Sequence, residues 1–176
     1  MNTNSKGWKK LFLCCLGLFA GTAFCMKWME ADLLQNGQTF TVIGLEITYP
    51  KEKVLSILSG LDEHVKTILR YHLSFDFVFM AGVYPGIAAL CMMARNRSYK
   101  PFTQKLLLLL AILQVAAWGF DIVENLYLLK WMKNAAIGNE FTLYHSIVAA
   151  KWIIALGGAL IAIPLVLIKK KPAQQG

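Results

Sequence analysis

The stretch that decides the fold is GFDIVENL, residues 119–126, where two acids and an amide interrupt an apolar run long enough to span a membrane. The run extends from Leu106 to about Leu129. On insertion scales each ionised carboxylate near a bilayer centre costs roughly 2.5 to 3.5 kcal/mol, and such residues usually face a bundle interior or a watery cavity. The stretch therefore predicts a buried polar site within a bundle of membrane helices.

Composition supports a membrane protein with a single domain, residues 1–176. The chain is 57% hydrophobic and has a mean hydropathy of +0.51, which is too apolar for an ordinary soluble domain. Its net charge of +8 comes from short basic clusters beside apolar segments, so we expect topology signals and no nucleic-acid partner. The four cysteines fall within predicted spans without metal-ligand spacing. We therefore expect no disulfide framework, no metal and no cofactor.

Four apolar segments predict an all-α membrane protein, a four-transmembrane-helix bundle. The spans are about 11–27, 72–94, 106–129 and 144–168. Residues 28–71 are the only sizeable extramembrane segment and predict a small extracytoplasmic insertion of strand and helix between the first two spans.

The first span has two features that need interpretation. Its apolar core follows three lysines and resembles a signal peptide, but the cleavage site at residues 21–23 is weak, so we treat it as an uncleaved helix. Small residues recur on one face and predict close packing against another helix; they are Cys14, Gly17, Gly21 and Cys25.

The insertion has two patterns. Between residues 40 and 49 apolar and polar residues alternate, with a change of phase at Gly44, which predicts one or two strands with a bulge or turn. After Pro50 the apolar residues fall at helical spacing and predict an amphipathic helix that ends near Gly60. Asp62 is a candidate cap for a helix that continues into the membrane.

Basic residues predict the orientation. The N-terminal segment, the loop between the second and third spans and the C-terminal segment carry 3, 4 and 3 Lys or Arg residues and no acid. The positive-inside rule then places both termini in the cytoplasm and residues 28–71 outside. We expect a multi-pass protein of the plasma membrane, which is the inner membrane in a bacterium.

With this topology the charges inside the spans reach a similar depth. Lys105 and Asp121 are 16 residues apart, which raises Asp121 about 24 Å across a hydrocarbon core of roughly 30 Å. Asp76 enters from outside about one turn after His72, and Lys151 enters about two turns into the fourth span. Three helices therefore bring charges to one level in the outer leaflet.

Helical angle places these residues on inward faces. At about 100° per residue Gln114, Asp121 and Asn125 lie within about 40° of one another, with Glu124 about 80° to one side. His72 lies one turn from Asp76 on the same face. The candidate polar site opens outward, has His72 and Gln114 beside it, and contains Asp76, Asp121, Glu124, Asn125 and Lys151. We expect Lys151 to pair with Asp121 or Glu124.

The cluster has a structural and a functional interpretation. In the structural one, Lys151 neutralises one carboxylate and the amides bond across helices, so that the cluster only specifies the fold. In the functional one, three acids against one lysine leave an excess, and neighbouring desolvated carboxyls cannot all stay ionised, which is suited to proton exchange or acid catalysis. The chain contains no nucleophile motif, phosphate loop or dinucleotide fingerprint, and no catalytic residue can be assigned.

The order of several motifs resembles a group of small uncharacterised bacterial four-span membrane proteins. After the extracellular strand and helix come LSFDFVF at 73–79, DIVEN at 121–125 and AKW at 150–152. The resemblance implies an architecture, with a D-x-x-E-N third helix and a lysine in the fourth, and it implies no activity. The strand region between the first two spans is also similar to claudin-type proteins, but the W-x-x-W signature is absent.

Three functions remain open from the sequence. The first is a membrane protein that binds or moves a small or amphiphilic ligand, such as a lipid, in the polar site. The second is an accessory or structural subunit that binds a membrane-protein partner through residues 28–71. If the protein is instead a proton-coupled carrier, we expect a homodimer, because four helices offer little room for alternating access. The third is a membrane-embedded enzyme that acts on a lipid with a carboxylate as acid or base. The lipid bilayer is the expected surrounding in each case.

Overall fold

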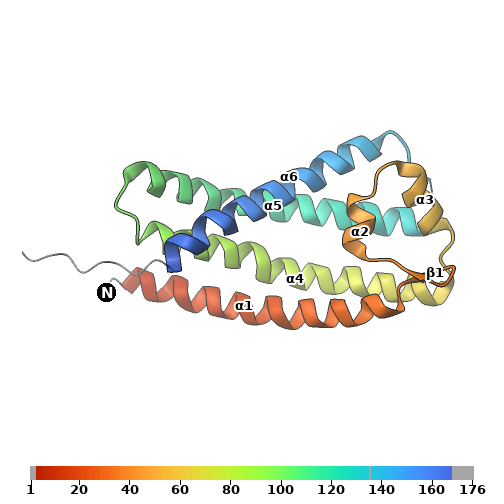
Figure 1. Ribbon diagram of the computed structural model, residues 1–176, viewed down its shortest axis with the longest axis horizontal. Helices are drawn as coiled ribbons and strands as arrows, with labels where there is room; N and C mark the ends of the chain where they lie inside the picture. The colour runs from red at the N-terminus through yellow and green to blue at the C-terminus, as the bar shows by residue number, and fades with distance from the viewer. Residues whose placement is uncertain (1–2, 135, 168–176) are drawn as a thin grey trace, which may run out of the picture.

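The structure is a computed structural model that describes residues 3–134 and 136–167. Four of its helices are long and apolar enough to span a membrane, as in a multi-pass membrane protein, and they lie along one another in an elongated bundle (Figure 1). They are α1 (Thr3–Met29), α4 (Glu63–Arg95), α5 (Pro101–Lys133) and α6 (Glu140–Leu167). The predicted four-helix membrane bundle with a small insertion after the first helix is confirmed.

The helices extend beyond the predicted spans because local signals set their ends. Asp62 caps α4, since its Oδ1 accepts a hydrogen bond from the Val65 N–H at 2.8 Å, and this cap starts the helix nine residues before His72. Pro101 occupies the first turn of α5, where its missing N–H costs no helical hydrogen bond. The basic cluster 169–171 and the last residue of the predicted fourth span lie outside the described residues.

The insertion contains a hairpin and two short helices. A 3-10 turn, η1 (Glu30–Asp32), leads into β1 (Leu34–Gln35) and β2 (Gln38–Thr39), which pair antiparallel. The turn residues Asn36 and Gly37 have φ of 51° and 78°, the combination that a tight hairpin favours. The second half holds α2 (Val42–Ile47) and α3 (Lys51–Ser59). The amphipathic helix predicted after Pro50 is therefore confirmed.

The strands predicted between residues 40 and 49 are wrong, because the segment forms α2. Thr41 caps this helix by accepting a hydrogen bond from the Gly44 N–H at 2.9 Å. Val42, Leu45 and Glu46 are buried together, which is the i, i+3, i+4 face of a helix. Apolar residues also alternate on either side of Gly44, at 40 and 42 and then at 45, 47 and 49, so this short segment fitted the strand period as well.

The predicted close packing of the small residues on α1 is wrong for contacts within this chain. Gly17 and Gly21 have nothing within 4 Å of where a Cβ would stand, and Cys14 is exposed, so the small-residue face of α1 does not pack within the chain. The close approach instead uses Gly82 of α4, where a Cβ would meet the Phe19 nitrogen at 2.8 Å. A glycine is needed there because the atom it would meet belongs to the backbone of α1.

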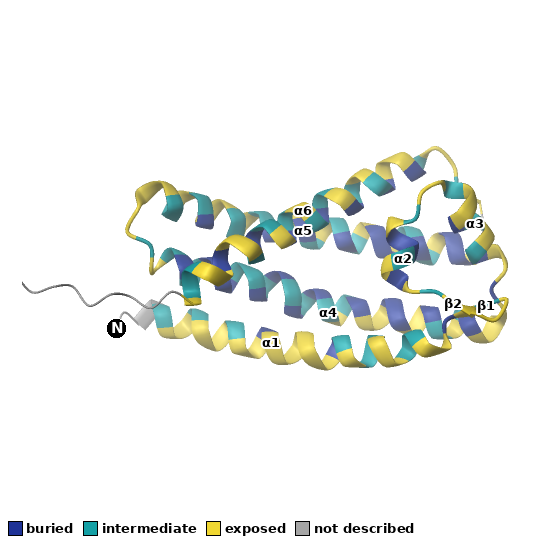
Figure 2. Cartoon of the chain, in the orientation of Figure 1, coloured by how far each residue is buried: buried dark blue, intermediate teal, exposed yellow. Residues whose placement is uncertain are grey.

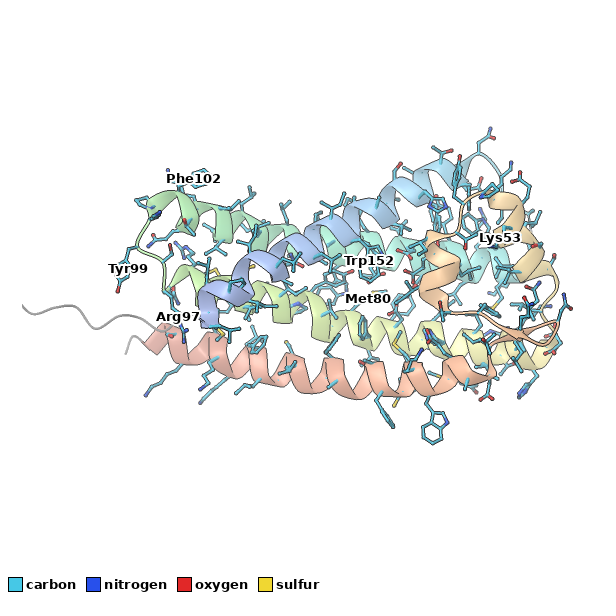
Figure 3. The ribbon with its side chains drawn as sticks, in the orientation of Figure 1. Lys53, Met80, Arg97, Tyr99, Phe102 and Trp152 are labelled. Carbon is cyan, nitrogen blue, oxygen red and sulfur yellow. The ribbon has the colours of Figure 1, made fainter. Side chains whose placement is uncertain are left out.

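The apolar core follows the long axis of the bundle in three clusters. At the insertion end, Val54, Leu69, Trp131 and Tyr144 join α3 to α4, α5 and α6. A middle cluster surrounds Met80, and a third lies toward the opposite end of the bundle. Figure 3 places Met80 and Trp152 in the middle of the bundle, and Figure 2 shows buried residues between the helices and exposed residues on the outer surfaces.

Candidate functional site

The ammonium group of Lys151 lies among three carboxylates. Its Nζ is 2.6 Å from Asp121 Oδ1, 2.5 Å from Glu124 Oε2 and 3.3 Å from Glu46 Oε2. The ammonium has three donors and no acceptor: it donates hydrogen bonds to Asp121 and Glu46, and its contact with Glu124 is an ion pair. The predicted pairing of Lys151 is confirmed with both Asp121 and Glu124.

Three elements position these groups. Asp121 and Glu124 are one turn apart on α5, and both are buried. Lys151 comes from a face of α6 where it shares burial with Ala155, the small residue one turn further on. The fourth group, Glu46, comes from α2 of the insertion. The site therefore joins α5 and α6 to α2 of the insertion.

Two further hydrogen bonds hold the carboxylates of Asp121 and Asp76. The Tyr84 hydroxyl donates to Asp121 Oδ2 at 2.7 Å, so that both oxygens of Asp121 are engaged. The Asn125 Nδ2 donates to Asp76 Oδ2 at 2.6 Å. Asp76, Asp121, Glu124, Asn125 and Lys151 thus come together at one level, as the helical rise predicts.

Carboxyl groups outnumber amines within the site. The buried acids are Glu46, Asp76, Asp121 and Glu124, whereas the buried amine among them is Lys151. None of the ion pairs between described residues involves Asp76. Burial raises the pKa of Glu46, and the nearby ammonium opposes this only in part. The cluster therefore has an affinity for additional positive charge, whether from protons or from a cation.

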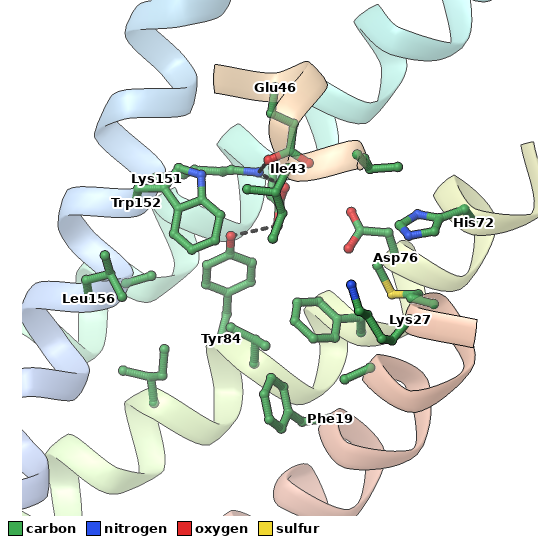
Figure 4. A pocket seen from close by; sticks show the side chains of 18 of the residues that line it. Phe19, Lys27, Ile43, Glu46, His72, Asp76, Tyr84, Lys151, Trp152 and Leu156 are labelled. Atoms are coloured by element: carbon green, nitrogen blue, oxygen red, sulfur yellow. Dashed lines mark hydrogen bonds and ion pairs between the residues drawn. The ribbon is translucent and has the colours of Figure 1, made fainter. Parts of the chain in front are cut away.

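A cavity of about 530 Å³ opens beside this cluster (Figure 4). Its polar end is lined by Glu46, His72, Asp76, Asp121 and Lys151. Away from this end the walls are apolar and come from α1, α4 and α6. The arrangement gives one cavity a charged end and an apolar end.

The two residues predicted beside the cluster have different positions. His72 lines the cavity near Asp76 and is 2% exposed, and its Nδ1 has no hydrogen-bond partner among the described residues. Gln114 does not reach the cluster. Its Nε2 donates to the Ile154 carbonyl at 3.2 Å and links α5 to α6 nearer the opposite end of the bundle.

Sequence reasoning missed Glu46 and Tyr84 as members of the site. Glu46 follows Val42 by four residues, and a helical reading of this segment would have placed the two side chains on one face. Tyr84 follows Asp76 by eight residues, which places it about 80° from Asp76 around the helix. This spacing is a signal that both side chains face the interior of the bundle.

Metal binding has no support from the described residues, because no three His, Cys, Asp or Glu side chains among them are grouped to hold an ion. All four cysteines are free thiols.

Comparison of the chain with protein-family models, curated proteins and solved structures finds no match. The chemistry of the site therefore has to be inferred from its own residues.

Proposed function

We propose that this chain is a plasma-membrane protein, of the inner membrane in a bacterium, that binds or moves a small amphiphilic ligand in the cavity beside Lys151. The observation that carries the proposal is a single cavity of about 530 Å³ with carboxylates at one end and apolar walls at the other. Sites for small ligands range from about 300 to 1,000 Å³ and combine apolar walls with a few convergent polar groups. An amphiphile matches both ends of the cavity.

The proposed orientation has the insertion outside and both termini in the cytoplasm. The start of α1 and the turn from α4 into α5 lie at the end of the bundle opposite the insertion (Figure 1). By the bounds of these helices, that end carries Lys10, Arg97 and Lys100. The positive-inside rule assigns that end to the cytoplasm. A cysteine introduced at Lys51 should then be labelled from outside, and one at Lys100 only after permeabilisation. The reverse labelling would overturn the orientation and the outward-facing cavity.

Ligand binding can be tested by filling the apolar end of the cavity. Ala159 lines the cavity, whereas Leu160, the next residue on α6, is 69% exposed on the outer surface. A C12 amphiphile that binds the native state raises the Tm of the protein in lipid nanodiscs, by mass action. We expect at least one of three probes, dodecylamine, dodecanol and dodecyl phosphate, to raise the Tm of the wild type and of Leu160→Phe, and none of them to raise the Tm of Ala159→Phe. Equal shifts in the two variants, or no shift in any protein, would refute binding in the cavity.

A second candidate is an enzyme that acts on a lipid, and one observation favours it. The carboxylate of Asp76 lies at the cavity wall without an ionic partner among the described residues, where it can exchange a proton with a bound molecule. Chemical conversion of a bound lipid that is lost in Asp76→Asn, with binding retained, would establish the enzyme. Binding without conversion would leave the ligand-binding function.

A further inference from the structure

The amines that line the cavity are already engaged, and one of its carboxylates is not. Lys151 contacts three carboxylates, and the exposed Lys27 pairs with Glu30 at 2.7 Å. Asp76 is 7% exposed, lines the cavity and takes part in no ion pair with a described residue. The polar end of the cavity therefore offers a carboxylate without an ionic partner and no free ammonium group.

The carboxylate of Asp76 is held in place to receive a ligand. Asn125 donates to its Oδ2 at 2.6 Å, and its Oδ1 has no hydrogen bond from any described residue. Figure 4 shows this carboxylate directed into the cavity, on the side opposite Lys151. A buried carboxylate with one oxygen fixed and the other free is a built counter-ion site, since leaving it unpaired is costly in a medium of low dielectric constant.

Aromatic rings surround the same end of the cavity. Phe79, Tyr84 and Trp152 all line it. The face of the Trp152 ring is occupied by the Lys151 ammonium, 5.5 Å from the ring centroid, which leaves the rings of Phe79 and Tyr84 for a ligand. Ring faces stabilise ammonium groups and do not stabilise phosphates or carboxylates.

The apolar end has the length of one leaflet. From Asp76, the lining of α4 continues to Ile87, 11 residues further along the helix, or about 16 Å of a hydrocarbon core roughly 30 Å thick. α4 forms the back of the cavity, and α1 and α6 form its sides. α2 lines the cavity at the insertion end, and α1 and α6 scarcely contact each other, so the gap between α1 and α6 is where the cavity can open toward the bilayer.

We propose that the ligand is a single-chain amphiphile with a cationic amine head, which enters from the bilayer between α1 and α6 and pairs with Asp76. This inference rests on the ligand-binding function proposed above. The tail lies along α4 toward Ile87, and the head lies against Asp76, on the side of the cavity opposite Lys151. An anionic head is excluded by the same geometry, because it would meet the excess of carboxylates without a free ammonium to receive it.

The experiment compares three C12 probes that differ only in the head group: dodecylamine, dodecanol and dodecyl phosphate. Affinities are measured in lipid nanodiscs at neutral pH for the wild type, Asp76→Asn and Glu63→Gln. Asn keeps the acceptor that Asn125 needs and removes the charge. Glu63 also lies on α4, but its side chain is 86% exposed, so Glu63→Gln removes the same charge far from the cavity.

We expect the wild type to bind dodecylamine most tightly and dodecyl phosphate most weakly. Asp76→Asn should weaken dodecylamine by about tenfold or more, the effect of a lost charge-assisted hydrogen bond. Dodecanol should bind Asp76→Asn as it binds the wild type, and Glu63→Gln should behave as the wild type with all three probes. Dodecanol or dodecyl phosphate binding as tightly as dodecylamine in the wild type would overturn the cationic head, even if Asp76→Asn does not fold. Failure of all three probes would instead refute the ligand-binding function itself.

Discussion

Replacing Lys151 with Met removes the ammonium that Glu46, Asp121 and Glu124 share. Met has a similar length and no charge, so the carboxylates stay buried without their counter-ion. Removing one partner of a buried ion pair costs about 3–5 kcal/mol. Since one ammonium serves three carboxylates here and Lys151 is only 5% exposed, we expect a loss near the upper end, about 5 kcal/mol, in the free energy of unfolding.

The assay is equilibrium unfolding in mixed micelles, in which SDS is titrated into a mild detergent and helicity is followed by circular dichroism. Lys130→Met is the matched control, because the Lys130 side chain is 65% exposed and lies 3.9 Å from Glu140. A surface pair of this kind contributes about 0–1 kcal/mol. If Lys151→Met costs no more than Lys130→Met, the buried cluster does not stabilise the bundle as described.

A second variant tests the cause of the loss. Adding Glu124→Gln to Lys151→Met replaces one uncompensated carboxylate with a neutral amide of the same shape. The double variant should therefore be more stable than Lys151→Met alone. If the loss of unfolding free energy in Lys151→Met simply adds to that of Glu124→Gln, and also to that of Asp121→Asn, Lys151 is not paired with these residues.

Three further predictions concern the elements around the site. Gly82→Ala should cost about 1–3 kcal/mol by forcing α1 away, since its Cβ would stand 2.8 Å from the Phe19 nitrogen, whereas Gly21→Ala should cost nothing because no atom lies within 4 Å; unfolding of both variants checks this. Thr41→Ala should destabilise the insertion by about 1 kcal/mol through loss of the cap on α2, as measured by local hydrogen exchange. Burial raises the pKa of Glu46 above its ordinary value of 4.5. The contribution of Glu46 to stability is therefore fully present below pH 4.5 and is lost as the pH rises through the raised pKa. Wild-type stability should fall with rising pH relative to that of Glu46→Gln, and parallel stability curves for the two proteins would refute the raised pKa.

Much of the polar site could be predicted because long helices are regular. A fixed rise and a fixed turn per residue bring Asp121 of α5 and Lys151 of α6 to one level and one interior, and the two groups meet at 2.6 Å. The cost of burying an isolated charge in a membrane then selects the pairing.

Glu46 and the cavity could not be obtained in this way. A six-residue segment such as α2 satisfies both the helical and the strand period, so its inward face is ambiguous before the Thr41 cap is known. The cavity depends on how α1 packs against α4, and small residues on both helices permit different contacts. The close approach of α1 to α4 occurs at Gly82 of α4, whereas Gly17 and Gly21 of α1 face open space. Such contacts depend on the shapes of the packed side chains, which residue spacing alone does not encode.

The central claim is that the cavity between α1 and α6 holds a single-chain amphiphile against Asp76. A high-resolution structure of the protein in lipid, soaked with dodecylamine, tests it most directly. We expect one elongated density along α4, with its amine within hydrogen-bond distance of Asp76 Oδ1 and its tail reaching Ile87. Side chains of α1 closing against α6, or a cavity that contains only ordered water beside Asp76, would contradict the claim.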